Sequence, residues 1–475
     1  MENKAALFRW VEAHQQAFCD LSDRVWGTPE ICYTEYRSVA EHTAMLKQQG
    51  FRVTENVADI PTAVMGEAGE GGPIIAFLGE YDALPGLSQQ AGVAHYAPLP
   101  GNGNGHGCGH NLLGSGAMLA ATALKAWLEE TGTSGRVRYY GCPAEEGGAA
   151  KSFMARAGAF EGVDVAITWH PSAHHEVAKP LSLANTRMDF AFSGRSSHAA
   201  ASPHLGRSAL DAAELMNVGV QFLREHVPQD SRIHYAFLDA GGVAPNVVQA
   251  KSTVRYAIRA RDVHAMFELN ERVKRIAEGA ALMTDTKVDI SIMSAVSNLL
   301  GNRPLEEAMQ RNLEALGTVP FDDADRAFAA EIQTTLSAEE IASCYRKTGV
   351  KPAQPAPLSD YIIPLDTHGE VMIGSTDVGD VSWVIPTVQA HIPTMAIGTP
   401  GHSWQLTAQG KMPAAHKALA HVAKVMAATA VDALTDKVLL AQVKKAHFEQ
   451  VSEKPYHCPI PAEVKPPIQP RPDTL

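Results

Sequence analysis

Three buried-type segments constrain the fold of this chain most strongly, because each ends in residues that can perform chemistry. The segments 73–79, 136–141 and 163–168 have the length and composition of covered β-strands, and helical patterns at 112–128 and 149–158 lie between them. Strands that alternate with helices in this way predict an α/β domain built on a central sheet. In open α/β sheets, functional sites lie at the carboxyl ends of the strands.

The residues that follow these segments are of the catalytic or ligand type. Glu80 and Asp82 follow the first segment, Glu145 and Glu146 follow the second, and His170 follows the third. One such coincidence carries little weight, but three in series indicate a site at one edge of the sheet. Taken alone, the pair of neighbouring glutamates has a simpler interpretation, because acids at a helix N-terminus complement its dipole.

A glycine-rich loop at 105–111 adds two residues of the metal-ligand type before an apolar helical pattern over 112–128. Its Cys108 and His110 offer a thiolate and an imidazole, which suit zinc or a manganese-like ion, with softness favouring zinc. The glycines let the backbone turn tightly, so both side chains can point into one cleft. A lone Cys-x-His is more typical of a buried thiol beside a loop histidine, so the interpretation depends on residues downstream.

The pattern changes at residue 187, where alternating strands replace the covered ones. From there the order is strand–helix–strand–strand–helix–strand, which predicts an α+β, ferredoxin-like unit with helices on one face of an antiparallel sheet. A chain of 475 residues is too long for one core. We therefore expect a discontinuous catalytic domain, residues 1–186 and 299–475, and an inserted domain, residues 187–298. Within 321–370 we expect one helix, over 324–346, and assign no role.

Charge and cysteine usage exclude several classes of protein. The formal net charge of -12 provides no field that would favour nucleic acid or an anionic membrane. Six cysteines without paired spacing are typical of reduced thiols in a cytoplasm. The N-terminus lacks the apolar core of a signal peptide, and the most apolar stretch, 418–433, carries His421, Lys424 and Asp432. We expect a soluble, cytoplasmic protein without nucleic-acid or membrane partners.

Five residues of the metal-ligand type lie far apart in the sequence, but all follow predicted strands: Cys108, His110, Glu146, His170 and His402. The strand expected before His402 covers residues 394–398. Together the five residues could hold two divalent metal ions bridged by water. Two ions about 3.5–4 Å apart would polarise a carbonyl and lower the pKa of that water. Glu145 would then be free to act as general base and later as proton donor.

These motifs resemble one known family. The segments 79–85, 107–110, 143–148 and 169–171 resemble the aminoacylase/carboxypeptidase family of dinuclear metallohydrolases, and more narrowly its amidohydrolase branch, which includes auxin-conjugate hydrolases. The segments 197–203 and 241–248 resemble that family's dimerisation domain. Finer details are similar to the B-type chains of p-aminobenzoyl-glutamate hydrolases, and they lie at 109–114, 202–208, 375–383 and 456–459.

The resemblance implies a metallopeptidase-type domain with a central mixed sheet and an inserted dimerisation domain that closes over the substrate. It implies that the five residues named above hold two zinc or manganese ions and that Glu145 is the general base. Asp82 falls on an acid that orients a ligand histidine, and His198 on a histidine that reaches into the partner's site and stabilises an oxyanion. Asn246 and Arg259 fall on positions that hold the substrate carboxylate.

The implied function is metal-dependent hydrolysis of the amide of an N-acyl amino acid. The narrowest interpretation is cleavage of p-aminobenzoyl-glutamate, a folate catabolite, to p-aminobenzoate and glutamate. An auxin-conjugate-type or general N-acyl-amino-acid hydrolase is an alternative, and so is a non-catalytic partner subunit of a heteromeric hydrolase, although the intact ligand set argues against the latter. The chain would pair with itself through the inserted domain or with a related A-type chain. Asn111 departs from the branch, which usually has Asp there; the amide supports the site by hydrogen bonding without adding charge.

Overall fold

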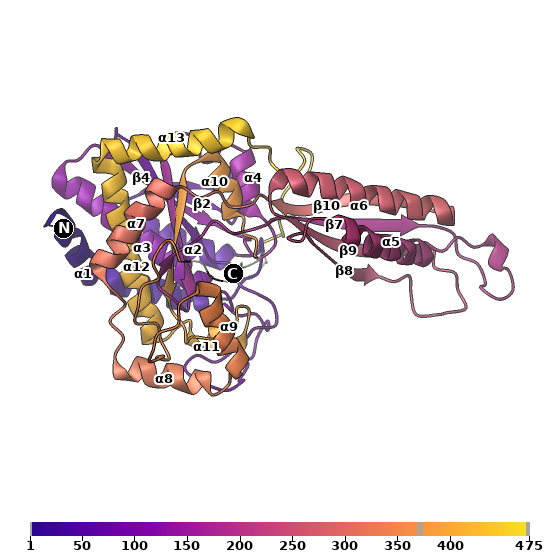
Figure 1. Cartoon of the computed structure of the whole chain (residues 1–475), viewed down its shortest axis with the longest axis horizontal. Helices are drawn as coiled ribbons and strands as arrows, with labels where there is room; N and C mark the ends of the chain where they lie inside the picture. Colours follow the sequence, from indigo (N-terminus) through magenta and orange to yellow (C-terminus); the bar gives the residue numbers. More distant parts are fainter. Residues whose placement is uncertain (1, 368, 370–373, 472–475) are drawn as a thin grey trace.

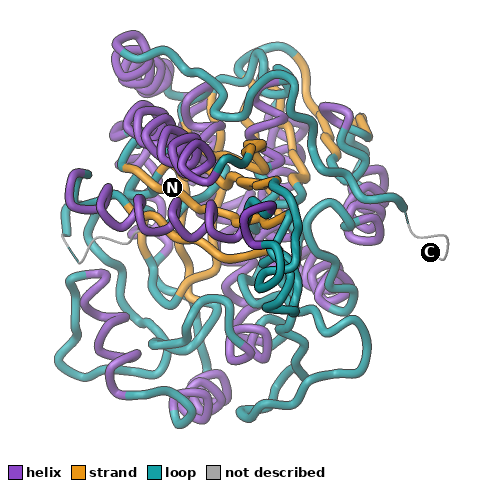
Figure 2. The backbone as a smooth tube through the Cα atoms, turned by 90° about the vertical axis from the view of Figure 1, so that its right-hand side faces the viewer, coloured by secondary structure: helices purple, strands orange, loops and turns teal. Residues whose placement is uncertain are grey.

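The computed structural model describes residues 2–367, 369 and 374–471. These form a large α/β body and an elongated α+β unit that projects from one side of it (Figure 1). Seen from the side on which the unit projects, strands lie at the centre of the molecule with helices around them (Figure 2).

The body is built on a seven-stranded mixed sheet. Its strands, in spatial order, are β1 (Arg52–Glu55), β2 (Val64–Glu70), β4 (Gly135–Cys142), β3 (Ile74–Glu80), β5 (Val165–Ser172), β11 (Thr387–Pro393) and β6 (Glu176–Val177). The four strands β4, β3, β5 and β11 run parallel, whereas β1, β2 and β6 pair antiparallel. The expected central mixed sheet is confirmed, and the three segments that predicted it are three of its parallel strands.

Helices cover both faces of this sheet. One face packs in a single core against α1 (Glu2–Trp26), α3 (His110–Thr131), α7 (Arg303–Leu316) and α12 (Pro413–Thr435). The other face carries α4 (Ala150–Arg156) and α10 (Val378–Val384). The remaining helices of the body are α2 (Tyr36–Gln48), η1 (Val57–Asp59), α8 (Asp323–Gln333), α9 (Ala338–Thr348), α11 (Trp404–Gln409) and α13 (Lys437–Glu453).

Helix α12 is, among the described residues, the one helix long and apolar enough to cross a membrane. Its most apolar window is 83% buried inside the protein, where it packs against α1, α3 and α7. Its apolar residues therefore belong to the core of the body, as expected for a central helix of a layered domain.

The projecting unit has a four-stranded antiparallel sheet in the order β10 (Lys287–Val296), β7 (Ala184–Ser193), β9 (Lys251–Ala260) and β8 (Arg232–Asp239). Buried and partly exposed residues alternate along β7 and β9, because helices cover one face only. Those helices are α5 (Ala209–Leu223) and α6 (Val263–Thr284), accompanied by η2 (Pro203–Leu205) and η3 (Arg224–His226). The expected α+β unit inserted into the α/β chain is confirmed, while its limits at 187 and 298 stay predictions.

Two expectations about single elements are wrong. The last parallel strand is β11, and the segment expected as a strand, 394–398, forms the turn that follows it. The helix expected over 324–346 is two helices, α8 and α9, because Ser337 begins a new helix with a capping box to Glu340.

Candidate metal centre

The parallel strands deliver the predicted site residues to one edge of the sheet. Glu80 ends β3 in register with Cys142 at the end of β4, three residues before Glu145. His170 lies near the end of β5. Parallel strands end at a common edge, so these side chains meet although up to 90 residues separate them.

Two irregular backbone positions bring in the remaining candidates. Gly109 has a φ of 79°, which favours glycine, and it turns the chain between Cys108 and the first residue of α3, His110. His402 lies in the loop between β11 and α11 and has a φ of 54°, in the left-handed region that non-glycine residues rarely adopt. A side chain held in this conformation is typical of a functional site.

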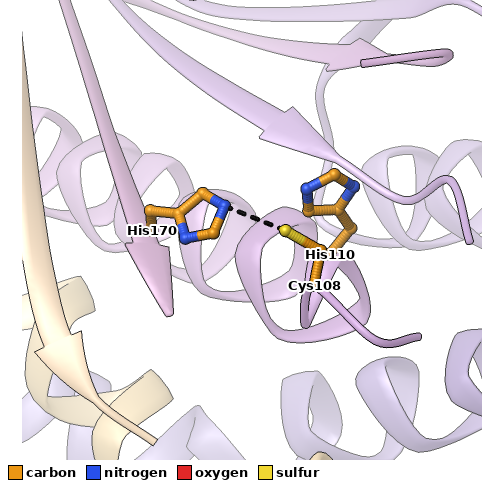
Figure 3. Close-up of side chains that lie close together, drawn as sticks. All are labelled: Cys108, His110 and His170. Atoms are coloured by element: carbon orange, nitrogen blue, oxygen red, sulfur yellow. Dashed lines mark hydrogen bonds between the residues drawn. The ribbon is translucent and has the colours of Figure 1, made fainter. Parts of the chain in front are cut away.

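All five predicted ligands meet in one cluster. Cys108 Sγ lies 3.4 Å from Nε2 of His170 (Figure 3), and His402 Nε2 lies 3.3 Å from Glu146 Oε2. Potential ligand atoms lie within 4.8 Å of one another in two groups that share the thiol: Cys108, His110 and His170, and Cys108, Glu146 and His402. The shared sulfur places the two groups side by side.

Asp82 fixes the orientation of one imidazole in this cluster. Its Oδ1 lies 2.8 Å from His110 Nδ1, and its Oδ2 accepts a hydrogen bond of 2.9 Å from the backbone N–H of Glu146. When Nδ1 donates to the carboxylate, the lone pair of Nε2 is left facing the cluster. The same side chain therefore positions two of the candidate ligands.

The environment of the cluster fits a divalent cation. Two of its buried atoms, His110 Nε2 and Glu146 Oε1, have no hydrogen-bond partner within the described part of the chain, although Glu80 Oε2 lies 3.2 Å from the former. A buried polar atom without a partner costs about 1–3 kcal/mol, and a metal ion would remove that cost. Sulfur, nitrogen and carboxylate oxygen together are the donor set typical of zinc.

Burial and neighbouring charges shift the pKa values in the cluster in different directions. Burial opposes the charged form of His110, but Cys108, Asp82 and Glu80 raise the pKa of His110 well above its usual value. Burial, assisted by the charge of His110, lowers the pKa of His170 to about 4, so its imidazole is in the neutral, metal-binding form. Burial raises the pKa of the Cys108 thiol well above its ordinary value, although His110 opposes the shift. A bound cation would favour the thiolate, as coordination does for cysteine generally.

Glu145 lies beside the ligands. It lines a cavity of about 180 Å³ together with Glu146, His402 and Ser375, and one of its carboxylate oxygens lies within 4.8 Å of ligand atoms of Glu80 and His110. Burial, and then the charges of Glu80 and Glu146, raise the pKa of Glu145 well above its usual value. A carboxyl group in this environment holds a proton readily, as a proton-transfer residue must.

A buried ion network that the sequence analysis missed lies beneath the cluster. The Lys151 ammonium is fully buried, 2.6 Å from Glu80 Oε1 and 2.6 Å from Asp377 Oδ1. Burial opposes its charge, but Asp377 and Glu80 raise the pKa of Lys151 well above its ordinary value. The available signal was a lysine in the apolar segment 149–154 directly after the two glutamates.

A second cavity, of about 530 Å³, has Cys108 and His170 in its wall. Much of its wall is apolar, with Ala173, Leu181, Met395 and Leu406, and α9 contributes Cys344, Lys347 and Thr348. The segment 321–370, which the sequence analysis left without a role, therefore contributes to a cavity next to the candidate metal ligands.

The substrate-binding candidates lie at opposite ends of the projecting unit. Arg259 Nη1 donates a hydrogen bond of 2.9 Å to Ser375 Oγ, which lines the smaller cavity. Asn246 and His198 are exposed and adjacent, in loops before β9 and after β7. Eight residues of β9, from Lys251 to Ile258, separate these loops from Arg259, which corresponds to about 26 Å along the strand. Within one chain, Arg259 lies near the cluster and the other two residues do not.

Comparisons with known proteins place this arrangement in a family. Residues 76–430 match the model described as peptidase family M20/M25/M40. The chain is 46% identical over 466 residues to the B-type subunit of the p-aminobenzoyl-glutamate hydrolase of Escherichia coli, a match that covers 96% of this chain and 97% of the relative. The A-type subunit of the same enzyme is 29% identical over 242 residues, 49% of this chain and 54% of the relative.

More distant proteins share the architecture. The Xaa-Arg dipeptidase of Mus musculus is 30% identical over 440 residues, covering 90% of this chain and 87% of the relative. The crystal structure of a dinuclear metal binding peptidase of the M20 family from Bacillus subtilis has a TM-score of 0.57 at 18% identity, covering 88% of this chain and 99% of that structure. At that identity the structural match establishes the fold.

Proposed function

Because the chain belongs to peptidase family M20/M25/M40 and is a metallohydrolase that acts on amide bonds, we propose that it cleaves p-aminobenzoyl-glutamate into p-aminobenzoate and glutamate. The reaction is supported above all by one observation, the meeting of five separate candidate metal-ligand side chains beside the partly buried Glu145. The identity of the substrate is supported by the match to the B-type subunit from Escherichia coli, which extends over nearly all of both chains.

We propose that the two groups of side chains that share Cys108 each hold one divalent ion, zinc or manganese. When bound, the ions would supply Lewis-acid polarisation of the amide carbonyl and a water of lowered pKa. Zinc is favoured because the shared ligand is a thiol, whereas the nitrogen and oxygen donors around it also suit manganese. Asp82 and the buried Lys151–Glu80 pair keep the ligands in place.

Proton transfer is assigned to Glu145. Its carboxylate would accept a proton from the attacking water and return it to the nitrogen of the leaving amino acid. The burial and neighbouring carboxylates that raise its pKa support this role, because they make the protonated form accessible near neutral pH. Glu146, its neighbour in sequence, is paired with His402 and takes the ligand role.

The two cavities suit the two halves of the substrate. The cavity of about 530 Å³ has apolar walls next to His170, and it would take the aromatic acyl group. Arg259, next to the smaller cavity, would bind the α-carboxylate of the leaving amino acid through its planar guanidinium. The scissile amide would then lie between them, at Cys108 and His170, which line both cavities.

A partner chain would complete the site. His198 and Asn246 lie too far from the cluster of their own chain to act there, so we propose that they act in the site of a partner, where the histidine would stabilise the oxyanion. Helix α5 offers an apolar docking surface, since Leu215, Val218 and Phe222 are exposed on it. The partner is a second copy of this chain or a related A-type chain, and the assembly is expected in the cytoplasm.

An assay of amide hydrolysis tests this proposal. In it, the purified chain is incubated with p-aminobenzoyl-glutamate and Mn²⁺ or Zn²⁺. We expect equimolar p-aminobenzoate and glutamate, abolished by a chelator and restored by metal. A panel that varies only the acyl group separates the proposed substrate from indole-acetyl and simple N-acetyl amino acids. A folded, metal-loaded protein that releases no product, alone or with an A-type chain, would instead support a non-catalytic role or another acyl group.

A further inference from the structure

Two arginines lie on the open face of the projecting sheet, at the end that joins the body. Arg187 on β7 is in register with Ala257 of β9, and Arg259 on β9 is in register with Asn185 of β7. The two arginines are thus diagonal neighbours on the face that α5 and α6 leave uncovered, with Cβ atoms about 7–8 Å apart.

Arg187 contacts the backbone next to a candidate metal ligand. Its Nη1 donates a hydrogen bond of 3.4 Å to the carbonyl oxygen of Gly147, the residue after Glu146. A Cβ at position 147 would lie 1.9 Å from this nitrogen, so only glycine permits the guanidinium to approach so closely. Since Arg259 Nη1 reaches Ser375 in the wall of the smaller cavity, both guanidinium groups lie beside the candidate metal centre.

Neither of these two guanidinium groups forms an ion pair with an acid in the described part of the chain. The contrast is Arg255 on the same face of β9, which binds both carboxylate oxygens of Asp189 at 2.6 and 2.8 Å. Burial, and then the positive charge of Arg187, lower the pKa of Arg259. Two cations that are held together, partly buried and without a counter-charge are stabilised when an anion binds between them.

We propose that Arg187 is a specificity-determining residue that binds the side-chain carboxylate of a dicarboxylic leaving amino acid, while Arg259 binds its α-carboxylate. This inference rests on the proposed hydrolysis and narrows its substrates to amides of acidic amino acids. The same pair of charges excludes a leaving residue with a cationic side chain, because a like charge would be desolvated next to Arg187.

The test compares p-aminobenzoyl-glutamate with p-aminobenzoyl-glutamine, which has nearly the same shape but a neutral side chain. Replacing Arg187 by glutamine should lower kcat/KM for the glutamate substrate about 10–100-fold, mainly through KM, because a charge-assisted hydrogen bond is lost. The value for the glutamine substrate should change by less than about threefold. Arg259→Gln should impair both substrates, because both carry the α-carboxylate.

The matched control is Arg272→Gln, which removes an exposed arginine of α6 that donates to the backbone of His226. Arg272→Gln should leave kcat/KM unchanged for both substrates. The inference would be overturned if Arg187→Gln lowered kcat/KM equally for both substrates, or if kcat/KM for the glutamate substrate were unchanged. If the wild-type protein hydrolyses neither substrate, the proposed function is wrong. The role of Arg187 is then tested separately, by measuring the binding of glutarate by calorimetry. Metal-loaded wild type should bind glutarate and Arg187→Gln should bind it at least about 10-fold more weakly; equal affinity contradicts the anion site.

Discussion

Glu145 and Glu146 are adjacent in sequence but lie in opposite electrostatic environments. Burial together with Glu80 and Glu146 raises the pKa of Glu145. Burial would also raise the pKa of Glu146, but the hydrogen bond to His402 and the charge of His110 lower it. Pairs of carboxyl groups whose pKa values are driven apart in this way divide the acid–base and ionic roles of an active site. This difference supports the proposed proton-transfer role of Glu145 and the proposed ligand role of Glu146.

Replacing Glu145 by glutamine should reduce kcat about 10²–10⁴-fold, the usual contribution of a positioned general base. The amide keeps the shape of the side chain and cannot take up a proton, so the metal content should equal that of the wild type. Steady-state kinetics with metal analysis of the same preparation checks both statements. Turnover at the wild-type rate would remove Glu145 from the mechanism.

Cys108 belongs to both groups of candidate ligands, so its loss should affect the binding of both proposed metal ions. In Cys108→Ser a hard hydroxyl replaces a soft thiolate, and zinc affinity should fall more than manganese affinity. Cys458, which lies outside the cluster, is the control, and Cys458→Ser should leave metal binding unchanged. Titration with a competing chelator measures this, and undiminished binding of two zinc ions by Cys108→Ser would contradict the shared role.

Most residues of the candidate site could be grouped from the sequence, because they follow parallel strands or lie in short glycine-containing motifs. All five ligand candidates are found together, and Asp82 contacts His110 as expected. Lys151 and Arg187 were not predicted. A lysine within the apolar segment 149–154 was a signal of a buried charge, but the sequence does not show that Lys151 lies under β3 or that Arg187 lies against Gly147. Their roles come from contacts between elements that the sequence does not place relative to each other.

At the level of elements, covered strands were easier to predict than their polar neighbours. The apolar run 73–79 predicts β3 to within a residue. In β11, however, Gln389 and His391 interrupt the apolar pattern, and the buried turn after it resembles a strand more closely. Composition alone does not separate a buried turn from a short covered strand. The capping box of Ser337 and Glu340 was a readable signal for the start of α9.

Three histidines buried in the body, His42, His175 and His421, should make the stability of the protein depend on pH. Burial lowers the pKa of His42 and His175 to about 3 and that of His421 to about 4, whereas an unfolded histidine titrates near about 6.5. Below that pH the unfolded chain binds protons that the folded chain does not. The contribution of these neutral histidines to the free energy of unfolding is therefore fully present above about pH 6.5. It falls as the pH decreases, by up to about 1.4 kcal/mol per pH unit for each histidine.

Urea unfolding at pH 7 and pH 5 checks this expectation. The unfolding free energy should fall between the two values, and His42→Asn should reduce that fall, whereas substitution of the exposed His14 should not. If the unfolding free energy of His42→Asn fell between pH 7 and pH 5 by as much as that of the wild type, His42 would not contribute to the pH dependence.

On the scale of the whole molecule, the length of β9 places His198 and Asn246 far from the candidate metal centre of their own chain. If they act across a symmetric dimer, two inactive proteins should complement each other. His198→Ala mixed one to one with Glu145→Gln, after exchange of protomers, should regain about a quarter of the wild-type sites, since half of the dimers are mixed and each has one intact site. Activity that stays at the level of the separate variants would contradict action across an interface.

The most direct test of the account is anomalous diffraction from crystals of the zinc-loaded protein. We predict two zinc peaks about 3.5–4 Å apart, one next to Cys108, His110 and His170 and the other next to Cys108, Glu146 and His402. A single peak, or zinc bound by other residues with this cluster empty, would contradict the assignment of the chain as a two-metal amidohydrolase.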